Sequence, residues 1–270
     1  MNPEELKGRQ KKLVKRRFRP KPIDPSLFSV EPTIRVLKKY GRFNAWAKEN
    51  GYLKNPVPTE EDKFEVYDVT SGGFHADLSP MILGPVLVDG LGFAANIEDG
   101  WQGCKVWSFH MRGCFAVDAK TLWQDDPTQP AHDPQGNAWI PEWRKWSEHI
   151  RFSGEAKRHR AKADPNAVNP NVPLFCYWQG ERLDYVTARC RMYVPWYAEL
   201  VQQTESYKYL KARFDAGTSL ILLDPDGQGR EQPWQALSRA TLTARIRDPE
   251  LIFGHGFVLA SVLLGVNVWS

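Results

Sequence analysis

The longest apolar run in this chain of 270 residues is Phe257–Val266, which is ten residues long. A helix that crosses a bilayer needs roughly 20 apolar residues, so this run is too short to span a membrane. It is apolar on every side, which predicts a helix buried in a protein core. Eleven Trp and 13 Phe residues can fill a substantial core around it. With 42% hydrophobic and 25% charged residues, the composition is globular and argues against a disordered chain, a collagen or a coiled coil.

Charge is distributed unevenly along the chain. Residues 1–22 hold nine Lys and Arg against two Glu, whereas the remaining residues hold 27 basic and 30 acidic side chains. We therefore expect residues 1–30 to be a flexible basic arm, because they contain too few apolar residues to form a core. Such an arm can bind the phosphates of a nucleic acid or cover an acidic surface of the protein itself. The candidate nucleic-acid contacts within residues 7–21 are Lys11, Lys12, Lys15, Arg16, Arg17 and Arg19.

Targeting signals and metal motifs are not recognisable in the sequence. The first 22 residues contain no apolar core and no small-residue cleavage site, so we expect no secretory signal and a cytoplasmic location. The four cysteines include no CxxC pair, which predicts neither a disulfide scaffold nor a structural zinc site. His110 and Cys114 have helical i,i+4 spacing but no third ligand, and we expect neither a metal ion nor a redox cofactor.

Residues 31–270 are predicted to form a single α+β domain, mainly helical with a small sheet. Helical spacing of apolar residues predicts helices over residues 31–50 and from Pro195 to Phe214, and Asn96 is a suitable N-cap for a third helix. Alternating or continuous apolar runs predict three strands, with the sequences FEVYDV, VPLFCYW and SLILLD.

A polar stripe follows Asn96 on the third predicted helix. Glu98, Trp101, Gln102 and Lys105 have i, i+3, i+4 and i+7 spacing, which places them on one helix face. In the functional interpretation this face is the wall of a pocket, where the indole stacks on a base or sugar and the charged groups act on the substrate. In the structural interpretation Trp101 belongs to the core and the charged residues lie at its rim.

A second candidate site comprises Asp248 and the turn Gly254-His255-Gly256, which precedes the apolar helix. A helix N-terminus suits a phosphate, glycines allow a ligand to approach the backbone, and an imidazole exchanges a proton near neutral pH. The alternative is a tight turn in which His255 is a capping or core residue. We interpret a third polar segment, residues 224–227 (DPDG), as a turn rather than a site.

The stripe E-x-x-W-Q-x-x-K, which begins at Glu98, resembles the E-x-x-[FW]-Q-x-x-K helix of the NADAR family. The segment that runs from Asp248 to Gly256 resembles the D-x-x-W-G-x-G turn of that family, and SLILLD resembles a segment that precedes this turn. The resemblance spans about residues 74–265. It departs from the family pattern at Asp99, where the family has His, and at Phe253, where it has Trp.

The resemblance implies a NADAR-like fold and an N-glycosidase-like hydrolase. Its substrate class is an ADP-ribosyl, ribosyl-phosphate or modified-nucleotide ligand, cleaved between ribose C1 and a nitrogen, with no cofactor. Glu98 then stabilises the oxocarbenium-like ribose, Lys105 holds oxygens or protonates the leaving nitrogen, and Asp248 orients a hydroxyl. The implied substrate-binding residues are Trp101, Gln102, Gly254, His255 and Gly256.

Two other functions remain open from the sequence. A non-enzymatic nucleic-acid or nucleotide-binding protein uses the basic arm and a second basic segment, EAKRHRAK, to hold phosphates while aromatic residues stack on bases. A structural or assembly protein keeps the fold without the activity, and ribose phosphates then leave its melting temperature unchanged.

Overall fold

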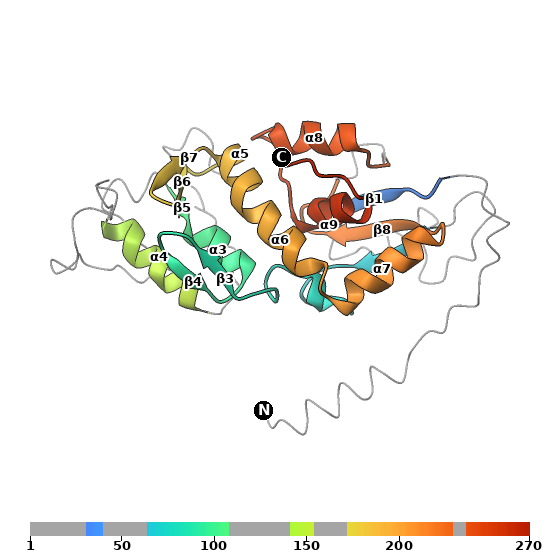
Figure 1. Ribbon diagram of the computed structural model, residues 1–270, viewed down its shortest axis with the longest axis horizontal. Coiled ribbons are helices and arrows are strands. Elements are labelled where there is room, and N and C mark those ends of the chain that lie inside the picture. Colours follow the sequence, from blue (N-terminus) through green and yellow to red (C-terminus); the bar gives the residue numbers. More distant parts are fainter. Residues whose placement is uncertain (1–30, 40–63, 108–140, 154–171, 229–235) are drawn as a thin grey trace, which may run out of the picture. The chain divides into compact units, whose positions relative to one another are not determined.

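A computed structural model describes residues 31–39, 64–107, 141–153, 172–228 and 236–270. The chain divides into two compact units, Met1–Glu31 and Pro32–Ser270, and the elements described below belong to the second unit (Figure 1). Three predictions lie outside the described residues: the nucleic-acid contacts from Lys11 to Arg19, the His110–Cys114 pair and the EAKRHRAK segment.

A parallel sheet of three strands forms one part of the second unit. Strand β8 (Ser219–Asp224) lies between β1 (Ile34–Lys38) and β2 (Phe64–Asp68), and both neighbours pair with it in parallel. A strand that has partners on both sides is expected to be a continuous apolar run, and SLILLD has this character. The buried helix α9 (His255–Leu263) packs against β1 and β8. The predictions of β2, β8 and the apolar helix are confirmed.

The prediction of a helix over residues 31–50 is wrong for its first part. Residues Ile34–Lys38 form strand β1, and the residues from 40 onward lie outside the described part of the chain. Ile34 and Val36 have β-branched side chains that suit a strand, and both are fully buried. Pairing with β8 satisfies the backbone of this segment, so a tertiary contact overrides the helical spacing of its apolar residues.

Two antiparallel sheets and two helices form a second part of the same unit. The hairpin of β3 (Val86–Val88) and β4 (Gly92–Ala94) precedes helix α3, and β5 pairs with a second hairpin. Helix α3 packs against α4, where Gly103 lies close to the side chain of Arg151. The bounds of the other elements are Ile97–Gly103 (α3), Lys105–Val106 (β5), Pro141–Ser153 (α4), Phe175–Trp178 (β6) and Glu181–Leu183 (β7).

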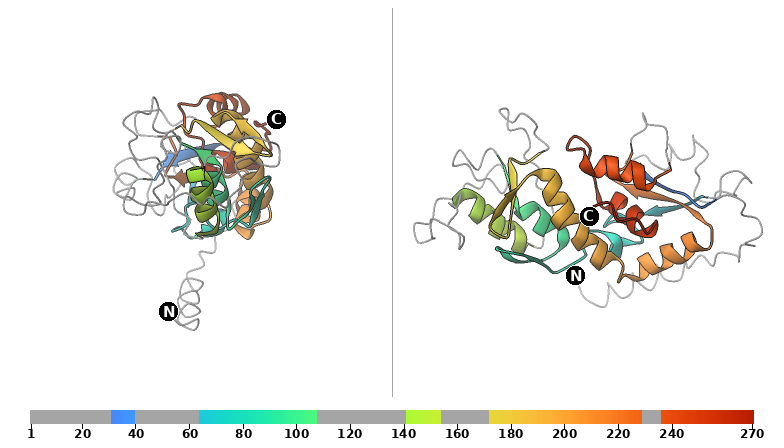
Figure 2. Two further views of the ribbon diagram at one scale, coloured as in Figure 1. Left: turned by 90° about the vertical axis from the view of Figure 1, so that its left-hand side faces the viewer. Right: turned by 45° about the horizontal axis from the view of Figure 1, so that its top comes forward.

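A continuous helical segment connects these two parts. It consists of α5 (Tyr185–Ala188), the π-helical turn η4 (Arg189–Tyr193) and α6 (Val194–Val201). Its beginning contacts β6, its π-helical turn contacts α3, and α6 packs against α9 (Figures 1 and 2). The predicted helix from Pro195 to Phe214 is divided, since α7 (Glu205–Asp215) follows after a break. The described residues also contain the helical elements η2 (Ala76–Leu78) and α8 (Arg239–Arg247).

The described residues therefore form a mixed α+β fold, which confirms the predicted class. The strands belong to three small sheets rather than to one. Within the described residues, no helix combines the length and the apolar character that crossing a membrane requires. The likeness to the NADAR fold stays a prediction.

Candidate functional site

The polar stripe is divided between a helix and a strand. Asn96 caps α3, since its side chain accepts a hydrogen bond of 2.8 Å from the backbone N–H of Asp99. Glu98, Trp101 and Gln102 lie on α3, as predicted. The prediction that Lys105 continues this helix is wrong, because α3 ends at Gly103 and Lys105 pairs with β6 in strand β5.

Glu98, Gln102 and Lys105 nevertheless form one hydrogen-bonded row. The amide nitrogen Nε2 of Gln102 donates to Oε1 of Glu98 over 2.9 Å, and Nζ of Lys105 donates to Oε1 of Gln102 over 3.1 Å. All three side chains are buried. The backbone N–H of Glu98 donates to the carbonyl oxygen of Pro80 over 3.0 Å, which fixes the start of the helix. The row and Trp101 are called the Lys105 cluster below.

Aromatic rings surround the ammonium group of Lys105. Its Nζ lies 4.4 Å from the ring centroid of Trp101 and 5.9 Å from that of Tyr185. The Trp101 ring in turn lies 5.7 Å from Tyr185 and 5.4 Å from Tyr193 between centroids. These rings favour a cation through their electron-rich faces, but they accept no conventional hydrogen bond.

Lys105 is only 6% exposed, and among the described residues no carboxylate forms an ion pair with it. An ammonium group has three N–H donors, of which Gln102 takes one. The neighbouring thiol of Cys176 does not supply an anion, because burial and the nearby Cys104 raise its pKa and keep it protonated. A buried cation with one hydrogen-bond acceptor in the described part of the chain is costly, so a further oxygen acceptor would stabilise it.

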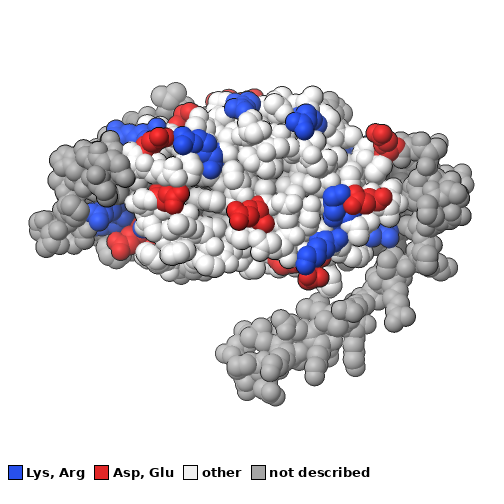
Figure 3. All heavy atoms as spheres, viewed as in Figure 1, with Lys and Arg blue, Asp and Glu red and all other residues white. Residues whose placement is uncertain are grey.

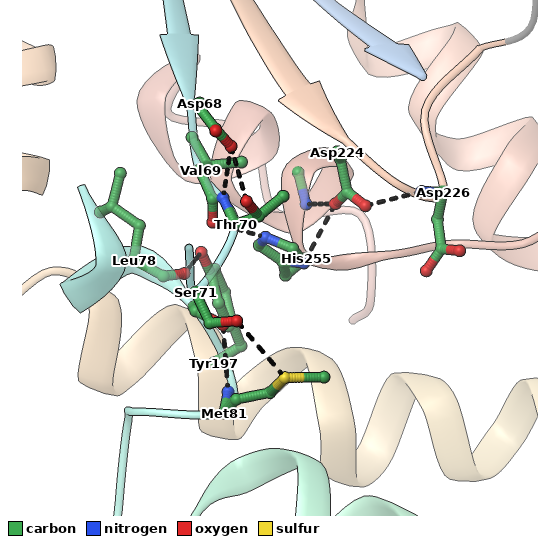
Figure 4. Close-up of polar contacts among 12 residues, drawn as sticks. Asp68, Val69, Thr70, Ser71, Leu78, Met81, Tyr197, Asp224, Asp226 and His255 are labelled. Atoms are coloured by element: carbon green, nitrogen blue, oxygen red, sulfur yellow. Dashed lines mark hydrogen bonds and ion pairs between the residues drawn. The ribbon is translucent and has the colours of Figure 1, made fainter. Parts of the chain in front are cut away.

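The second candidate site is organised around Asp224 at the end of β8, which is fully buried. Its Oδ2 accepts a hydrogen bond of 2.6 Å from the backbone N–H of Gly256, and its Oδ1 accepts one of 2.7 Å from Asp226. Nδ1 of His255 lies 3.1 Å from the same Oδ2, and Nε2 of His255 donates to the carbonyl of Val69 over 2.9 Å (Figure 4). We call Asp224, Asp226, His255 and the two flanking glycines the Asp224 cluster.

Both glycines beside His255 allow this close packing. A Cβ at position 256 would lie 2.8 Å from Oδ2 of Asp224, and one at position 254 would lie 2.7 Å from Cβ of Asp226. These contacts give Gly254 and Gly256 a role that needs no ligand. The carboxylate of Asp224 lies against the N-terminus of α9, where the sequence led us to expect a phosphate. The phosphate role of this turn stays a prediction.

Asp248 lies at the C-terminal end of α8, and its Oδ1 accepts a hydrogen bond of 2.8 Å from the backbone of Glu250. The carbonyl of Asp248 is held by Arg189, a residue that the sequence analysis missed. Arg189 also donates to the carbonyls of Ile246 and Leu251, and its guanidinium lies 4.6 Å from the ring of Tyr185.

The predicted site residues therefore form two separate clusters, and Asp248 belongs to neither. Glu98, Trp101, Gln102 and Lys105 lie together, as do Gly254, His255 and Gly256. Tyr185 and Arg189 connect Lys105 to the turn of Asp248. The signal that could have identified these residues is a four-residue repeat in the sequence: Tyr185, Arg189, Tyr193 and Tyr197.

Comparison of the chain with protein-family models, with curated proteins and with solved structures found no match. In the part of the chain that the structure describes, no group of three or more His, Cys, Asp or Glu residues is arranged to hold a metal ion.

Proposed function

We propose that the chain is an N-glycosidase-like hydrolase acting on an ADP-ribosyl, ribosyl-phosphate or modified-nucleotide substrate. The observation that carries the proposal is the buried ammonium of Lys105, which has one amide acceptor among the described residues and lies over the Trp101 ring. A ligand with a planar base and oxygen-rich sugar or phosphate groups matches both features, since the base stacks on an indole and the oxygens accept from an ammonium.

The row of Glu98, Gln102 and Lys105 suits the cleavage of a ribosyl C1–N bond. In this reaction the C1–N bond breaks, the oxygen of a water molecule bonds to C1, and a proton reaches the leaving nitrogen. The carboxylate of Glu98 stabilises the positive charge that develops on the ribose and accepts a proton from the attacking water. Lys105 donates a proton or a hydrogen bond to the leaving side, and Gln102 keeps the acid and the amine at a fixed separation.

In this proposal the turn of residues 248–256 binds the sugar and phosphate groups of the substrate. Asp248 would orient a ribose hydroxyl, and the backbone between Gly254 and Gly256 would face a phosphate. The backbone N–H of Gly256 already donates a hydrogen bond to Asp224, so a phosphate would accept hydrogen bonds from other N–H groups of the turn. This part of the proposal is separable from the role of Glu98.

Substitution of Glu98 by Gln tests the proposal. The change keeps the shape of the side chain and removes the negative charge that the reaction requires. Turnover of NAD, ADP-ribose and ribosylated nucleotides is measured for both proteins, together with their melting temperatures. We expect loss of turnover with little change in melting temperature. Glu205→Gln is the matched control, because Glu205 is 88% exposed and distant in sequence from the row.

Two results contradict the hydrolase proposal. Full activity of the Glu98→Gln variant excludes Glu98 as the catalytic carboxylate. Absence of turnover by the unmodified protein with every one of these compounds excludes the substrate class.

A non-enzymatic nucleic-acid-binding protein is the second candidate, and the observation that favours it is the charge of residues 1–22. On the face drawn in Figure 3, acidic and basic side chains of the described residues are interspersed. In this candidate the basic side chains of residues 1–22 attract the phosphates. Affinity for a single-stranded oligonucleotide is then expected to fall steeply with salt and to disappear when residues 1–22 are removed. Unchanged affinity after truncation contradicts this candidate.

A further inference from the structure

The helical segment from Tyr185 to Val201 presents Tyr185, Arg189, Tyr193 and Tyr197 at four-residue intervals. In a regular α-helix, four residues overshoot one turn of 3.6 residues, so such a row drifts around the helix. A π-helical turn accommodates more residues, and η4 lies in the middle of the row. The local π geometry offsets the drift and keeps Tyr185 and Tyr193 against the same partner, Trp101.

Tyr185 is the accessible member of the rings beside Lys105. Trp101 and Lys105 are both buried, whereas Tyr185 is only partly buried. Its ring centroid lies 5.7 Å from that of Trp101 and 5.9 Å from Nζ of Lys105. Among the rings that the structure places beside Lys105 and Trp101, Tyr185 is therefore the one with solvent exposure, since Tyr193 is buried as well.

Arg189 fixes the position of this ring. Its side chain is 1% exposed, and its guanidinium donates to the carbonyls of Ile246, Asp248 and Leu251 over 3.2, 3.3 and 3.1 Å. These bonds hold the guanidinium at the end of α8, where the partial negative charge of the helix also favours a cation. The immobilised guanidinium lies 4.6 Å from the Tyr185 ring, so the ring is held by a cation–π contact.

We propose that Tyr185 is a ligand-binding residue of the Lys105 cluster and that Arg189 is its positioning residue. The inference rests on the proposed hydrolase and adds two residues to its site. Tyr185 and Trp101 form an aromatic wall for the planar base of the substrate. Arg189 acts through Tyr185 and ties the wall to the turn that carries Asp248.

Two substitutions at Tyr185 test the first part. Tyr185→Phe keeps the ring and removes only the hydroxyl, whereas Tyr185→Leu removes the aromatic face. Stacking of a base on an aromatic ring strengthens binding by about tenfold or more, so we expect Tyr185→Leu to raise KM by about that factor with kcat little changed. Tyr185→Phe should keep the KM of the unmodified protein.

A double-mutant cycle tests the second part. If Arg189 acts through Tyr185, then Arg189→Met raises KM, but adding it to Tyr185→Leu raises KM no further. A merely structural role of Arg189 gives a further increase in the double variant and overturns the positioning claim. Arg189→Lys, which keeps a cation, completes the same cycle if Arg189→Met does not fold.

Acetylation of Lys105, followed by mass spectrometry, gives a readout that needs no turnover. Tyr185→Leu should speed the reaction at Lys105 because the ring that lies over the amine is lost, and Tyr185→Phe should not. Equal rates in Tyr185→Leu and the unmodified protein overturn the claim that Tyr185 lies on the path to Lys105.

Different results would overturn the hydrolase and the role of Tyr185. If Glu98→Gln is inactive and Tyr185→Leu keeps the unmodified KM, the hydrolase stands and the role of Tyr185 is overturned. If the unmodified protein turns over none of the compounds, the hydrolase proposal is overturned and the binding role of Tyr185 falls with it.

Discussion

Nδ1 of His255 lies 3.1 Å from Oδ2 of Asp224, while Nε2 of the same ring donates to the carbonyl of Val69. The ring thus joins the end of β8, the residue after β2 and the start of α9. The Tyr197 ring lies 5.9 Å away, and its hydroxyl donates to the carbonyl of Leu78. This buried junction links the carboxyl ends of β8 and β2 to the start of α9, and these contacts need no ligand.

We expect Asp224→Asn to destabilise the protein by about 3 kcal/mol, as breaking a buried charged network usually does. Both carboxylate oxygens accept backbone N–H groups, from Gly256 and Asp226, so the amide nitrogen of Asn must face one of these donors. Urea unfolding at pH 7 measures the change. Glu205→Gln is the control, since an exposed pair such as Glu205–Lys208 contributes about 0.5 kcal/mol or less. A loss for Asp224→Asn as small as that of the control contradicts the prediction.

Gly256→Ala is expected to cost about 1–3 kcal/mol, the usual range for overpacking a core. The new methyl group would lie 2.8 Å from Oδ2 of Asp224 and 3.0 Å from Cγ1 of Val36, and both neighbours are buried. Gly72→Ala provides the comparison, because a Cβ at position 72 has no atom within 4 Å. Thermal unfolding of both variants checks the prediction, which is wrong if the two lose equal stability.

The sequence predicts the buried elements of this fold better than their partners. The all-apolar helix α9 and the central strand β8 follow directly from their residues, because no other environment suits such runs. The segment around Ile34 has apolar residues at helical spacing and forms a strand, because β8 provides a pairing edge. Strand β8 lies far from Ile34 in the sequence, so the local spacing of apolar residues cannot predict that the two segments pair.

The residues of the candidate site are likewise easier to predict from the sequence than their contacts. The spacing from Glu98 to Lys105 brings the correct residues together, although Lys105 reaches Gln102 from a strand instead of from the next helical turn. Arg189 is missed, because a charged residue within a helix is normally expected at the surface. Its burial depends on three carbonyls that only the tertiary fold places around it.

His75 is expected to make the protein less stable in mild acid. Burial lowers the pKa of its imidazole below 6.5. The negative charges of Asp77 and Asp68 act to raise this pKa, but their effect is smaller than that of burial. The unfolded chain therefore binds more protons than the folded one below about pH 6.5, so stability falls as the pH falls through this range. Burial acts to raise the pKa of Asp68, but hydrogen bonds from Lys39 and Thr70 lower it overall, so Asp68 adds a loss of stability at a more acidic pH than His75.

Urea unfolding at pH 7 and at pH 5 measures this effect. His75→Asn keeps a polar group near Ser206, whose Oγ lies 2.8 Å from Nδ1 of His75, and removes the titration. The loss of stability between the two pH values should be smaller in this variant. Ser206→Ala removes the hydroxyl but leaves the imidazole, so it should keep the full loss. An unchanged loss in His75→Asn contradicts the assignment.

Replacement of Lys105 by Met separates the two possible roles of its ammonium group. Met keeps an unbranched apolar stem over the Trp101 ring, and it removes a buried charge that has Gln102 as its hydrogen-bond acceptor. If the ammonium serves a ligand, the free protein should keep its stability or gain about 1 kcal/mol, since replacing buried charge by apolar volume is often neutral or stabilising. Turnover should be lost at the same time, as expected where function and stability are in conflict.

Lys208→Met, at an exposed position, should change neither the stability nor the turnover. A loss of more than about 2 kcal/mol in Lys105→Met, of the size that breaking a needed buried interaction produces, shows instead that Gln102 and the two rings satisfy the ammonium and that its role is structural.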